Sequence, residues 1–358
     1  MKTYRVLGLM SGTSLDGLDI ADCIFRFDNH KWLFEIKETI MIPYTNDWIN
    51  RLKDAPNLSG FNLIQLDKEY GVYLGNQVKE FLKKDSVNVD FVASHGHTVF
   101  HQPSLGVTFQ IGNGSSLANI SGLKVINDFR SLDVALGGQG APLVPIGDKL
   151  LFGDFDACLN LGGFANISFE KDEKRIAFDI CPVNILLNKI CEDHFDVKYD
   201  DKGKLSESGE IDKQLLQQLN DLPFYTEAYP KSLGKEWVDS NIIPLIEKIN
   251  CCRENLLRTV TEHIALQLSN VLSKYVSSDK DILVTGGGTY NSFLIERIKQ
   301  FSSCNVIIPE FKLIDFKEAL IFAFLGVLRT RNEINCLASV TGALKDSSGG
   351  IIHEGIFE

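Results

Sequence analysis

The sequence lacks the features of a membrane-spanning, secreted or nucleic-acid-binding protein. No uninterrupted apolar run reaches the ~18 residues of a membrane-spanning helix. Arg5 interrupts the first apolar stretch, so the N-terminus does not have the pattern of a secretory signal. Acidic residues outnumber basic ones by 47 to 36, and the formal charge of −11 disfavours binding to nucleic acid or to an anionic membrane. An anionic ligand must therefore be met by local donors or by a metal ion.

The eight cysteines lack the paired C-x-x-C spacing of a redox motif or a zinc site. Their scatter predicts reduced, mostly buried thiols in a cytoplasmic protein. With 358 residues, of which 44% are hydrophobic and 23% are charged, the chain is long enough to bury a large core. This length also favours a division into two domains.

A turn rich in glycine, hydroxyl and acidic residues follows the first apolar stretch, Tyr4 to Met10. Its candidate residues for binding the phosphates of ATP are Gly12, Thr13, Ser14, Asp16, Gly17 and Asp19. The glycines are expected to adopt positive φ, the hydroxyls to donate to phosphate oxygens, and Asp16 to suit magnesium carried by ATP. The turn is neither a Walker loop nor a Gly-x-Gly-x-x-Gly turn. A plain hairpin between two strands is an equally good interpretation.

The two halves of the chain show the same succession of elements. In the first half we expect strands at 4–10, 21–27, 32–42, 91–94 and 124–126, and an amphipathic helix over 66–82. In the second half we expect strands at 157–161, 165–169, 175–178, 281–285 and 306–308, and helices over 184–194, 257–275 and 316–329. This pattern predicts an α/β fold of two related domains that face a nucleotide cleft, which is the actin-like (ribonuclease H-like) layout. The expected domains are 1–130, with about 340–358 as a segment that could return to it, and 131–339.

Two glycine turns of the second half occupy positions that suit a nucleotide site. One follows the strand 157–161 and contains Gly162 and Gly163. The other follows the strand 281–285, and its candidate residues are Gly286, Gly287, Gly288 and Asn291. Three consecutive glycines would let an adenine and its ribose lie against the backbone. Together with the phosphate-type turn near the N-terminus, they favour ATP as a ligand.

A dense block at 127–145 combines Arg130 and Asp133 with three glycines, Gln139 and two prolines. A linker between domains is expected to be polar and loose, whereas this block is apolar and stiffened by proline. The composition favours a hinge or a binding loop, although a linker with a salt-bridged turn stays an alternative.

Several motifs in consistent order carry a specific resemblance. They are Gly-Leu-Met-Ser-Gly-Thr-Ser-Leu-Asp-Gly at 8–17, Ser-His-Gly at 94–96, Gln-Ile-Gly-Asn at 110–113, Asp-Phe-Arg at 128–130, Ala-Leu-Gly-Gly-Gln-Gly-Ala-Pro-Leu-Val-Pro at 135–145, Leu-Gly-Gly-Phe-Ala-Asn at 161–166, Gly-Gly-Gly at 286–288 and Val-Thr-Gly-Ala at 340–343. Over nearly the whole chain the sequence resembles the anhydro-N-acetylmuramic acid kinases. This resemblance implies an ATP- and Mg²⁺-dependent kinase of peptidoglycan recycling, which opens a 1,6-anhydro bridge with water and phosphorylates the freed 6-oxygen.

The resemblance also implies site residues. It places the catalytic base at Asp179, in a block that in the family reads Asp-x-Gly-Pro-Gly-Asn. It further makes His97, Arg130, Asp133 and Glu318 the candidate contacts of the sugar. For Glu318, a place in the first turn of a helix is an equally good explanation.

The chain departs from the family pattern around the expected base. Cys181 and Val183 stand where the family has glycines, and Leu233 replaces a threonine in a Lys-Ser-Thr-Gly loop. A β-branched valine resists positive φ, so we expect either a different backbone or a narrower sugar pocket. Two alternatives stay open: a repacked but active enzyme, and a non-catalytic or altered actin-fold protein that still binds nucleotide or sugar.

The histidines support a further alternative. His97 and His101 have the i, i+4 spacing of a helical metal-binding pair, as in metal-dependent carbamoyl transferases of the actin fold. Gly96, Thr98 and Val99 disfavour a helix at this place. The resemblance implies that the ligands are ATP and a small amino sugar, and the net charge disfavours nucleic acid and a membrane. The apolar final helix suits a homodimer interface as well as it suits the core.

Overall fold

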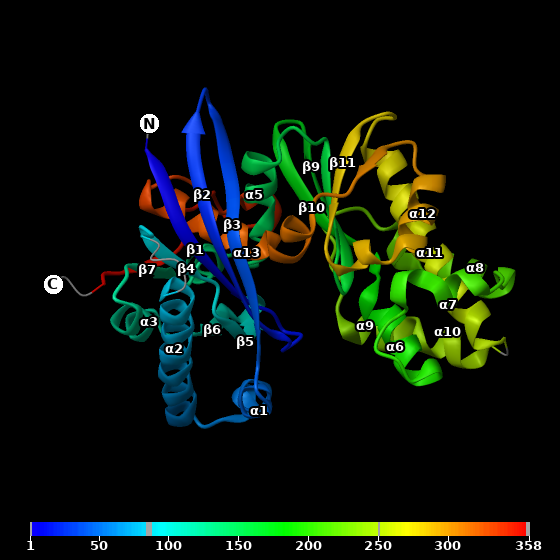
Figure 1. The fold of residues 1–358 in the computed structure, drawn as a ribbon. Helices are drawn as coiled ribbons and strands as arrows, with labels where there is room; N and C mark the ends of the chain where they lie inside the picture. The colour runs from blue at the N-terminus through cyan, green and yellow to red at the C-terminus, as the bar shows by residue number, and fades with distance from the viewer. Residues whose placement is uncertain (1, 84–87, 250, 356–358) are drawn as a thin grey trace. The chain divides into compact units, whose positions relative to one another are not determined.

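The structure, a computed structural model, describes residues 2–83, 88–249 and 251–355, and it divides into two compact units (Figure 1). Unit 1 holds the described residues up to Leu151 together with those from Phe316 onward. Unit 2 spans Phe152–Asp315. Each unit has a twisted mixed sheet with helices packed on it.

The main sheet of unit 1 has the strand order β13-β7-β4-β1-β2-β3. Its strands are β1 (Thr3–Ser11), β2 (Gly17–Asp28), β3 (Lys31–Pro43), β4 (Phe91–Ser94), β7 (Val125–Asn127) and β13 (Ile351–His353). β1, β2 and β3 are antiparallel neighbours, whereas β1, β4 and β7 run parallel. The carboxyl ends of β1, β3, β4 and β7 therefore lie at one edge of the sheet.

Helices and a two-stranded sheet complete unit 1. The helices are α1 (Asn46–Asp54), η1 (Ala55–Asn57), α2 (Gly60–Lys83), η2 (Pro103–Leu105), α3 (Gly114–Ser121), α4 (Ser131–Ala135), α5 (Val144–Leu151), α13 (Phe311–Thr330), which begins in unit 2, and α14 (Ala338–Thr341). The small sheet pairs β5 (His97–Gln102) with β6 (Val107–Ile111). Residues 319–325 of α13 are all buried, and Gly8 of β1 lies directly against the backbone of this helix at Ala319.

Unit 2 repeats the strand order of unit 1. Its sheet runs β10-β9-β8-β11-β12, built from β8 (Ala157–Leu161), β9 (Phe164–Lys171), β10 (Lys174–Pro182), β11 (Asp281–Thr285) and β12 (Asn305–Ile307). The first three strands are antiparallel neighbours, and β8, β11 and β12 are parallel. The carboxyl ends of β8, β10 and β11 consequently share one edge of the sheet.

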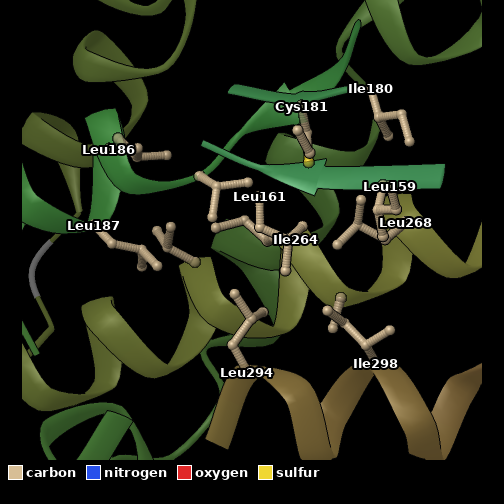
Figure 2. Packing of buried hydrophobic residues seen from close by; sticks show 14 of the residues in the cluster. Leu159, Leu161, Ile180, Cys181, Leu186, Leu187, Ile264, Leu268, Leu294 and Ile298 are labelled. Carbon is tan, nitrogen blue, oxygen red and sulfur yellow. The ribbon is translucent and has the colours of Figure 1, made fainter. Parts of the chain in front are cut away.

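The helices of unit 2 bury an apolar layer against this sheet. They are α6 (Asn184–Phe195), η3 (Asp201–Gly203), α7 (Lys204–Ser208), α8 (Lys213–Asn220), η4 (Pro223–Thr226), α9 (Lys235–Asn241), α10 (Ile243–Lys248), α11 (Arg253–Tyr275), η5 (Gly287–Tyr290) and α12 (Ser292–Phe301). Figure 2 shows Ile264 and Leu268 of α11 among Leu159 and Leu161 of β8 and side chains of α12. The long helix α11 is therefore the centre of this core.

The two units confirm the α/β fold of two related domains, because three antiparallel strands followed by parallel ones occur in each unit. The domain boundaries differ from those expected at 130/131 and 339/340. Residues 131–151 belong to unit 1, since α5 packs on β3. Residues 316–339 belong there too, because the buried side of α13 packs on β1. A kink at Phe316 (φ −113°, ψ 15°) marks the point where the chain enters unit 1 again.

Among the helices of the described residues, none combines the length and the apolar composition that crossing a membrane requires.

The close approach of Gly8 to α13 gives a first prediction. A Cβ at position 8 would overlap the carbonyl oxygen of Ala319, so Gly8→Ala should lower the free energy of unfolding by about 1–3 kcal/mol. Gly60 begins α2, and nothing lies within 4 Å of a Cβ there. Gly60→Ala is the matched control and should change the stability by less than about 1 kcal/mol, in the stabilising direction. Denaturant titration measures both, and equal losses would contradict the packing of α13 on β1.

Candidate active site

The turn between β1 and β2 presents polar side chains to solvent. Thr13, Ser14 and Asp16 are exposed, Gly12 and Asp19 are half-buried, and Gly17 is buried. The turn is a hairpin connection, because β1 and β2 pair from Ser11 and Leu18 outward. Its exposed hydroxyls are free to meet a ligand, and the binding of phosphate by this hairpin stays a prediction.

The glycines of this turn do not have the backbone conformation that we expected. Neither Gly12 nor Gly17 has positive φ, whereas Leu15 does, with φ 62°. A Cβ at Gly17 would overlap the carbonyl group of Ile42 on β3. Gly17 is therefore required by the close pairing of β2 with β3 and not by the approach of a ligand.

A chain of hydrogen bonds behind this turn ends at His97. The Tyr44 hydroxyl donates to Ser11 Oγ at 2.7 Å, and Ser11 Oγ lies 3.1 Å from His97 Nδ1. The Tyr70 hydroxyl lies 2.6 Å from the Tyr44 hydroxyl and supplies the next proton in the chain. Burial lowers the pKa of His97 to about 4, so the imidazole is neutral.

The helical metal pair is not formed. His97 and His101 lie on strand β5, where His97 is buried and His101 is exposed and within 3.1 Å of Thr108 Oγ1. The β-branched residues between them favour the strand, as their sequence indicated. Within the described ranges, no cluster of three or more His, Cys, Asp or Glu side chains could hold a metal ion.

Arg130 and His95 form a pair at the carboxyl edge of unit 1. Arg130 donates from Nε and Nη2 to His95 Nε2, at 3.1 and 2.9 Å, and from Nη1 to the Gly140 carbonyl oxygen at 3.0 Å. His95 Nδ1 donates to the Gly96 carbonyl oxygen at 2.9 Å. Burial, together with the charge of Arg130, lowers the pKa of His95 to about 3. His95 is therefore a neutral acceptor that orients the guanidinium.

Asp133 holds the loop at 137–140 and does not reach solvent. Its carboxylate accepts from the Gly140 N–H at 2.7 Å and from Thr341 Oγ1 at 2.8 Å, and Cys336 Sγ lies 3.1 Å away. Only 1% of Asp133 is exposed. The expected contact of Asp133 with the sugar is therefore replaced by a structural role, because both carboxylate oxygens are occupied inside unit 1.

Glu318 lies on α13, two residues after the kink at Phe316, and is exposed. Desolvation raises the pKa of its carboxyl, and the nearby charges of Arg130 and Lys317 partly oppose this effect. Glu318 and Arg130 are thus close enough to influence each other, whereas Asp133 is enclosed.

Two segments of unit 2 are joined by backbone hydrogen bonds at the shared carboxyl edge of its sheet. The carbonyl oxygens of Gly163 and Gly162 accept from the N–H groups of Val183 and Asn184, at 2.8 and 3.2 Å. Asn184 Nδ2 donates to the Leu161 carbonyl oxygen at 3.1 Å. The turn after β8 and the start of α6 are therefore fixed to each other.

The glycine turn after β11 packs on the end of β8, at Asn160 and Leu161. Gly286 has φ +87°, and a Cβ there would lie 2.5 Å from Asn160 Oδ1. A Cβ at Gly288 would lie 2.8 Å from Leu161 Cβ. Gly287, in contrast, is exposed and therefore the member of this turn most open to a ligand. Asn291 Oδ1 accepts from the Leu294 N–H at 2.9 Å and so caps α12.

Asp179 lies near the end of β10, half-buried, next to a bulge between Asp179 and Cys181. Its Oδ2 accepts from the Leu233 N–H at 2.8 Å, and its own N–H donates to the Lys231 carbonyl oxygen at 3.1 Å. Oδ1 accepts no hydrogen bond from the described residues. Burial raises the pKa of the Asp179 carboxyl, and the Leu233 hydrogen bond opposes this effect. In the Asp179 carboxylate, Oδ2 is therefore held by a hydrogen bond, and Oδ1 is available to a ligand or a water molecule.

The two substitutions beside Asp179 lie in the core and not in a pocket. Cys181 and Val183 are both fully buried, and Figure 2 shows Cys181 among the apolar side chains of unit 2. Neither residue has positive φ, and Val183 has φ −123°. Neither side chain is exposed, so neither offers a surface to a ligand, and the narrower sugar pocket stays a prediction. Burial also raises the pKa of the Cys181 thiol, which makes it a poor nucleophile.

The loop of Lys231 and Leu233 contacts Asp179 through backbone groups and not through side chains. Leu233 contributes an N–H group, which every residue type except proline offers, so the missing threonine hydroxyl does not affect this contact. Lys231 Nζ donates to the Phe224 carbonyl oxygen at 2.8 Å and lies over the Phe224 ring. Sequence reasoning missed this role of the loop, because a backbone donor leaves no signal in the residue types.

The repeated strand order and the turns at the carboxyl edges define an α/β protein of the actin-like class. The family model described as anhydro-N-acetylmuramic acid kinase matches residues 4–355, and the chain belongs to this family. It is 34% identical to the anhydro-N-acetylmuramic acid kinase of Sulfurovum sp. (strain NBC37-1), over 98% of this chain and 99% of the relative. The kinase of Mannheimia succiniciproducens is also 34% identical, with the same coverage. That of Hydrogenovibrio crunogenus is 33% identical over 97% of both chains.

Solved structures show a more distant similarity. The (R)-2-hydroxyglutaryl-CoA dehydratase component A of Acidaminococcus fermentans has a TM-score of 0.45 and 12% identity, and the match covers 89% of this chain and 96% of that one. A ROK family glucokinase from Streptomyces griseus, in complex with glucose and AMPPNP, has a TM-score of 0.40 and 11% identity over 90% and 98% of the two chains.

The glycine turn after β11 yields a prediction on stability. Gly286→Ala places a side chain at positive φ and against Asn160, so the free energy of unfolding should fall by about 1–3 kcal/mol. Gly287→Ala should change it by less than about 0.5 kcal/mol, because the nearest atom, Asn184 Nδ2, would lie 3.7 Å from the new Cβ. Thermal and denaturant unfolding of both variants compare the two positions. A larger loss for Gly287→Ala would show that the turn has another conformation.

Proposed function

We propose that this chain is an ATP-dependent kinase that hydrolyses the 1,6-anhydro ring of anhydro-N-acetylmuramic acid and phosphorylates the 6-oxygen, giving N-acetylmuramic acid 6-phosphate for peptidoglycan recycling. The family match over residues 4–355 and relatives of that name at 33–34% identity support the activity. The observation that carries the mechanism is Asp179, with one oxygen held by Leu233 N–H and the other open. The eight cysteines, all within the described residues, are free thiols, which agrees with a cytoplasmic enzyme.

Asp179 acts as the general base. Water attacks the anomeric carbon, its proton goes to Asp179 Oδ1, and the bond from the anomeric carbon to the bridging 6-oxygen breaks. The Leu233 N–H keeps Oδ2 in place, so that Oδ1 has one defined direction. The raised pKa of Asp179 makes the carboxylate a stronger base than an ordinary aspartate.

The freed 6-oxygen then attacks the γ-phosphorus of ATP, the bond between the β- and γ-phosphates breaks, and ADP leaves. Thr13 and Ser14 donate to the phosphate oxygens, and Gly12, Gly17 and Asp19 shape their turn. The exposed Gly287 and its neighbours Gly162, Gly163, Gly286, Gly288 and Asn291 form the surface for the nucleoside.

The donor set of the first turn fits magnesium that arrives on ATP. Asp16 and the hydroxyls of Thr13 and Ser14 are exposed oxygen donors, and Mg²⁺ binds oxygen through few protein groups when phosphates supply the others. Asp16 is the carboxylate that we assign to this ion. When bound, magnesium neutralises charge on the phosphates.

Residues of unit 1 bind the sugar. Arg130 is half-buried and is held by neutral His95, and its guanidinium suits the lactyl carboxylate. Glu318 lies near Arg130, is exposed and can accept from sugar hydroxyls. His97 turns its second ring nitrogen, Nε2, to the sugar. Asp133 supports this group by holding the loop next to Arg130.

Replacement of Asp179 tests the base directly. Asp179→Asn keeps the size of the side chain but cannot take the proton, so turnover should fall at least about 100-fold while ATP still binds. The assay is sugar-dependent ADP release with ATP, magnesium and anhydro-N-acetylmuramic acid, with mass spectrometry of the sugar product. The wild-type product should be heavier than the substrate by one water and one phosphate.

Leu233→Thr is the matched control and should leave turnover within about twofold, because the backbone N–H remains. Undiminished turnover in Asp179→Asn would refute the base. Binding of ATP by the wild-type protein without any sugar product would instead favour the non-catalytic alternative.

The raised pKa of Asp179 predicts the pH dependence of kcat/KM. The base works only when ionised, so the rate falls as pH drops through its pKa, and a raised pKa moves this fall to a higher pH than for an ordinary aspartate. This fall is the acid limb of the plot of kcat/KM against pH. Leu233→Pro removes the N–H that stabilises the charged carboxylate, so the acid limb should move to a still higher pH. An acid limb that is the same in the wild type and in Leu233→Pro would contradict this contact.

A further inference from the structure

A buried chain of hydrogen bonds in unit 2 connects helix α11 with the segment that holds Asp179. His263 of α11 is fully buried. Its Nδ1 lies 2.7 Å from Asn220 Oδ1 at the end of α8, and its Nε2 lies 2.9 Å from the Tyr225 hydroxyl in η4. Gln267 Nε2, one turn further along α11, also donates to Asn220 Oδ1, at 2.9 Å.

These contacts fix the tautomer of His263. Asn220 Oδ1 can only accept, so Nδ1 of His263 must carry the proton. Nε2 is therefore the acceptor, and the Tyr225 hydroxyl donates to it. Burial lowers the pKa of His263 to about 3, so the ring stays neutral at any pH at which the enzyme would be assayed. His263 is thus a permanent, oriented acceptor for Tyr225.

Tyr225 belongs to an aromatic cluster of residues that precede and follow the loop of Lys231 and Leu233. Its ring contacts His263, with centroids 4.9 Å apart, and Trp237 of α9, with centroids 6.0 Å apart. Phe224 lies 5.3 Å from Trp237 and receives the Lys231 ammonium at its carbonyl oxygen. Residues before and after the loop are therefore joined to each other, and their support in α11 is His263.

The loop in turn holds the carboxylate. The Lys231 carbonyl oxygen accepts from the Asp179 N–H at 3.1 Å, and the Leu233 N–H donates to Asp179 Oδ2 at 2.8 Å. A shift of the loop would therefore move both contacts together. Among the described residues, the Leu233 N–H is the one hydrogen-bond donor to the Asp179 carboxylate. If this hydrogen bond is lost, no other described donor replaces it.

We propose that His263, through Tyr225, is a positioning residue for Asp179, which keeps the Leu233 N–H on Oδ2 and directs Oδ1 toward the water. This inference rests on the proposed function, since it takes Asp179 as the base. His263 acts as a neutral hydrogen-bond acceptor and exchanges no proton during the reaction. It sets the orientation of Asp179, which does take a proton.

The test compares His263→Phe, Tyr225→Phe and the double variant. Loss of the acceptor should free the loop, and kcat should fall about 10-fold to 100-fold while KM for ATP and for the sugar stays within about twofold. The acid limb of kcat/KM should move to higher pH, because the carboxylate loses a hydrogen bond that favours its charged form. The double variant should be no slower than the slower single variant, since both remove one contact.

Leu272→Ala is the matched control for lost stability. Leu272 is buried on the same helix, more than two turns beyond His263, and its truncation should lower the melting temperature without moving the acid limb. If His263→Phe does not fold, Tyr225→Phe alone carries the test, because it removes only the hydroxyl.

The outcomes separate this inference from the proposed function. An inactive Asp179→Asn together with an unmoved acid limb in His263→Phe and Tyr225→Phe would overturn the positioning role and leave the base intact. Active Asp179→Asn would overturn the base itself. An acid limb that moves equally in Leu272→Ala would reduce His263 to a structural residue.

Discussion

The hydrogen bonds from the Val183 and Asn184 N–H groups to the carbonyl oxygens of Gly163 and Gly162 determine the arrangement of unit 2 around Asp179. They join the end of β10 to the turn after β8, and the glycine turn after β11 packs on the same residues. Because β8, β10 and β11 are parallel, their carboxyl ends already lie at one edge. The two backbone hydrogen bonds then hold the start of α6 against the turn after β8. Asp179 therefore lies on this edge of the sheet, and the loop of Leu233 contacts it from outside the sheet.

The same strand order gives different surfaces in the two units. In unit 1 the first connection is a hairpin with an exposed, hydroxyl-rich tip. In unit 2 the corresponding connection is short, and its carbonyl oxygens are used by the start of α6. In unit 2 the carbonyl oxygens of the glycine turn thus accept hydrogen bonds from within the unit. In unit 1 the hydroxyl groups of the longer turn stay exposed to solvent. The topology repeats, and the residues in the turns decide what each edge can bind.

The pattern of apolar residues predicted most strands and helices, because burial on one face imposes a period that the sequence shows directly. The turns at Gly162 and Gly286 were predicted from their glycines and their places after strands. The sequence could not place Asp133, since a carboxylate that binds Thr341 across more than 200 residues looks like one that binds a ligand. It also could not predict the contact of Leu233 with Asp179, which uses a backbone group. The units also differ from the expected domains, because α5 and α13 pack on the sheet of unit 1 and their own residues do not indicate which sheet they join.

The burial of Cys181 and Val183 has a consequence for how relatives of this chain can be recognised. Both side chains lie in the apolar core of unit 2, so these positions accommodate an apolar side chain as well as the glycine of the family pattern. A search pattern that demands glycine there would reject this chain, although Asp179, Pro182 and Asn184 stand in place. A pattern that fixes these three residues and admits any small apolar side chain between them describes the physical constraint, and it would admit members that a strict motif overlooks.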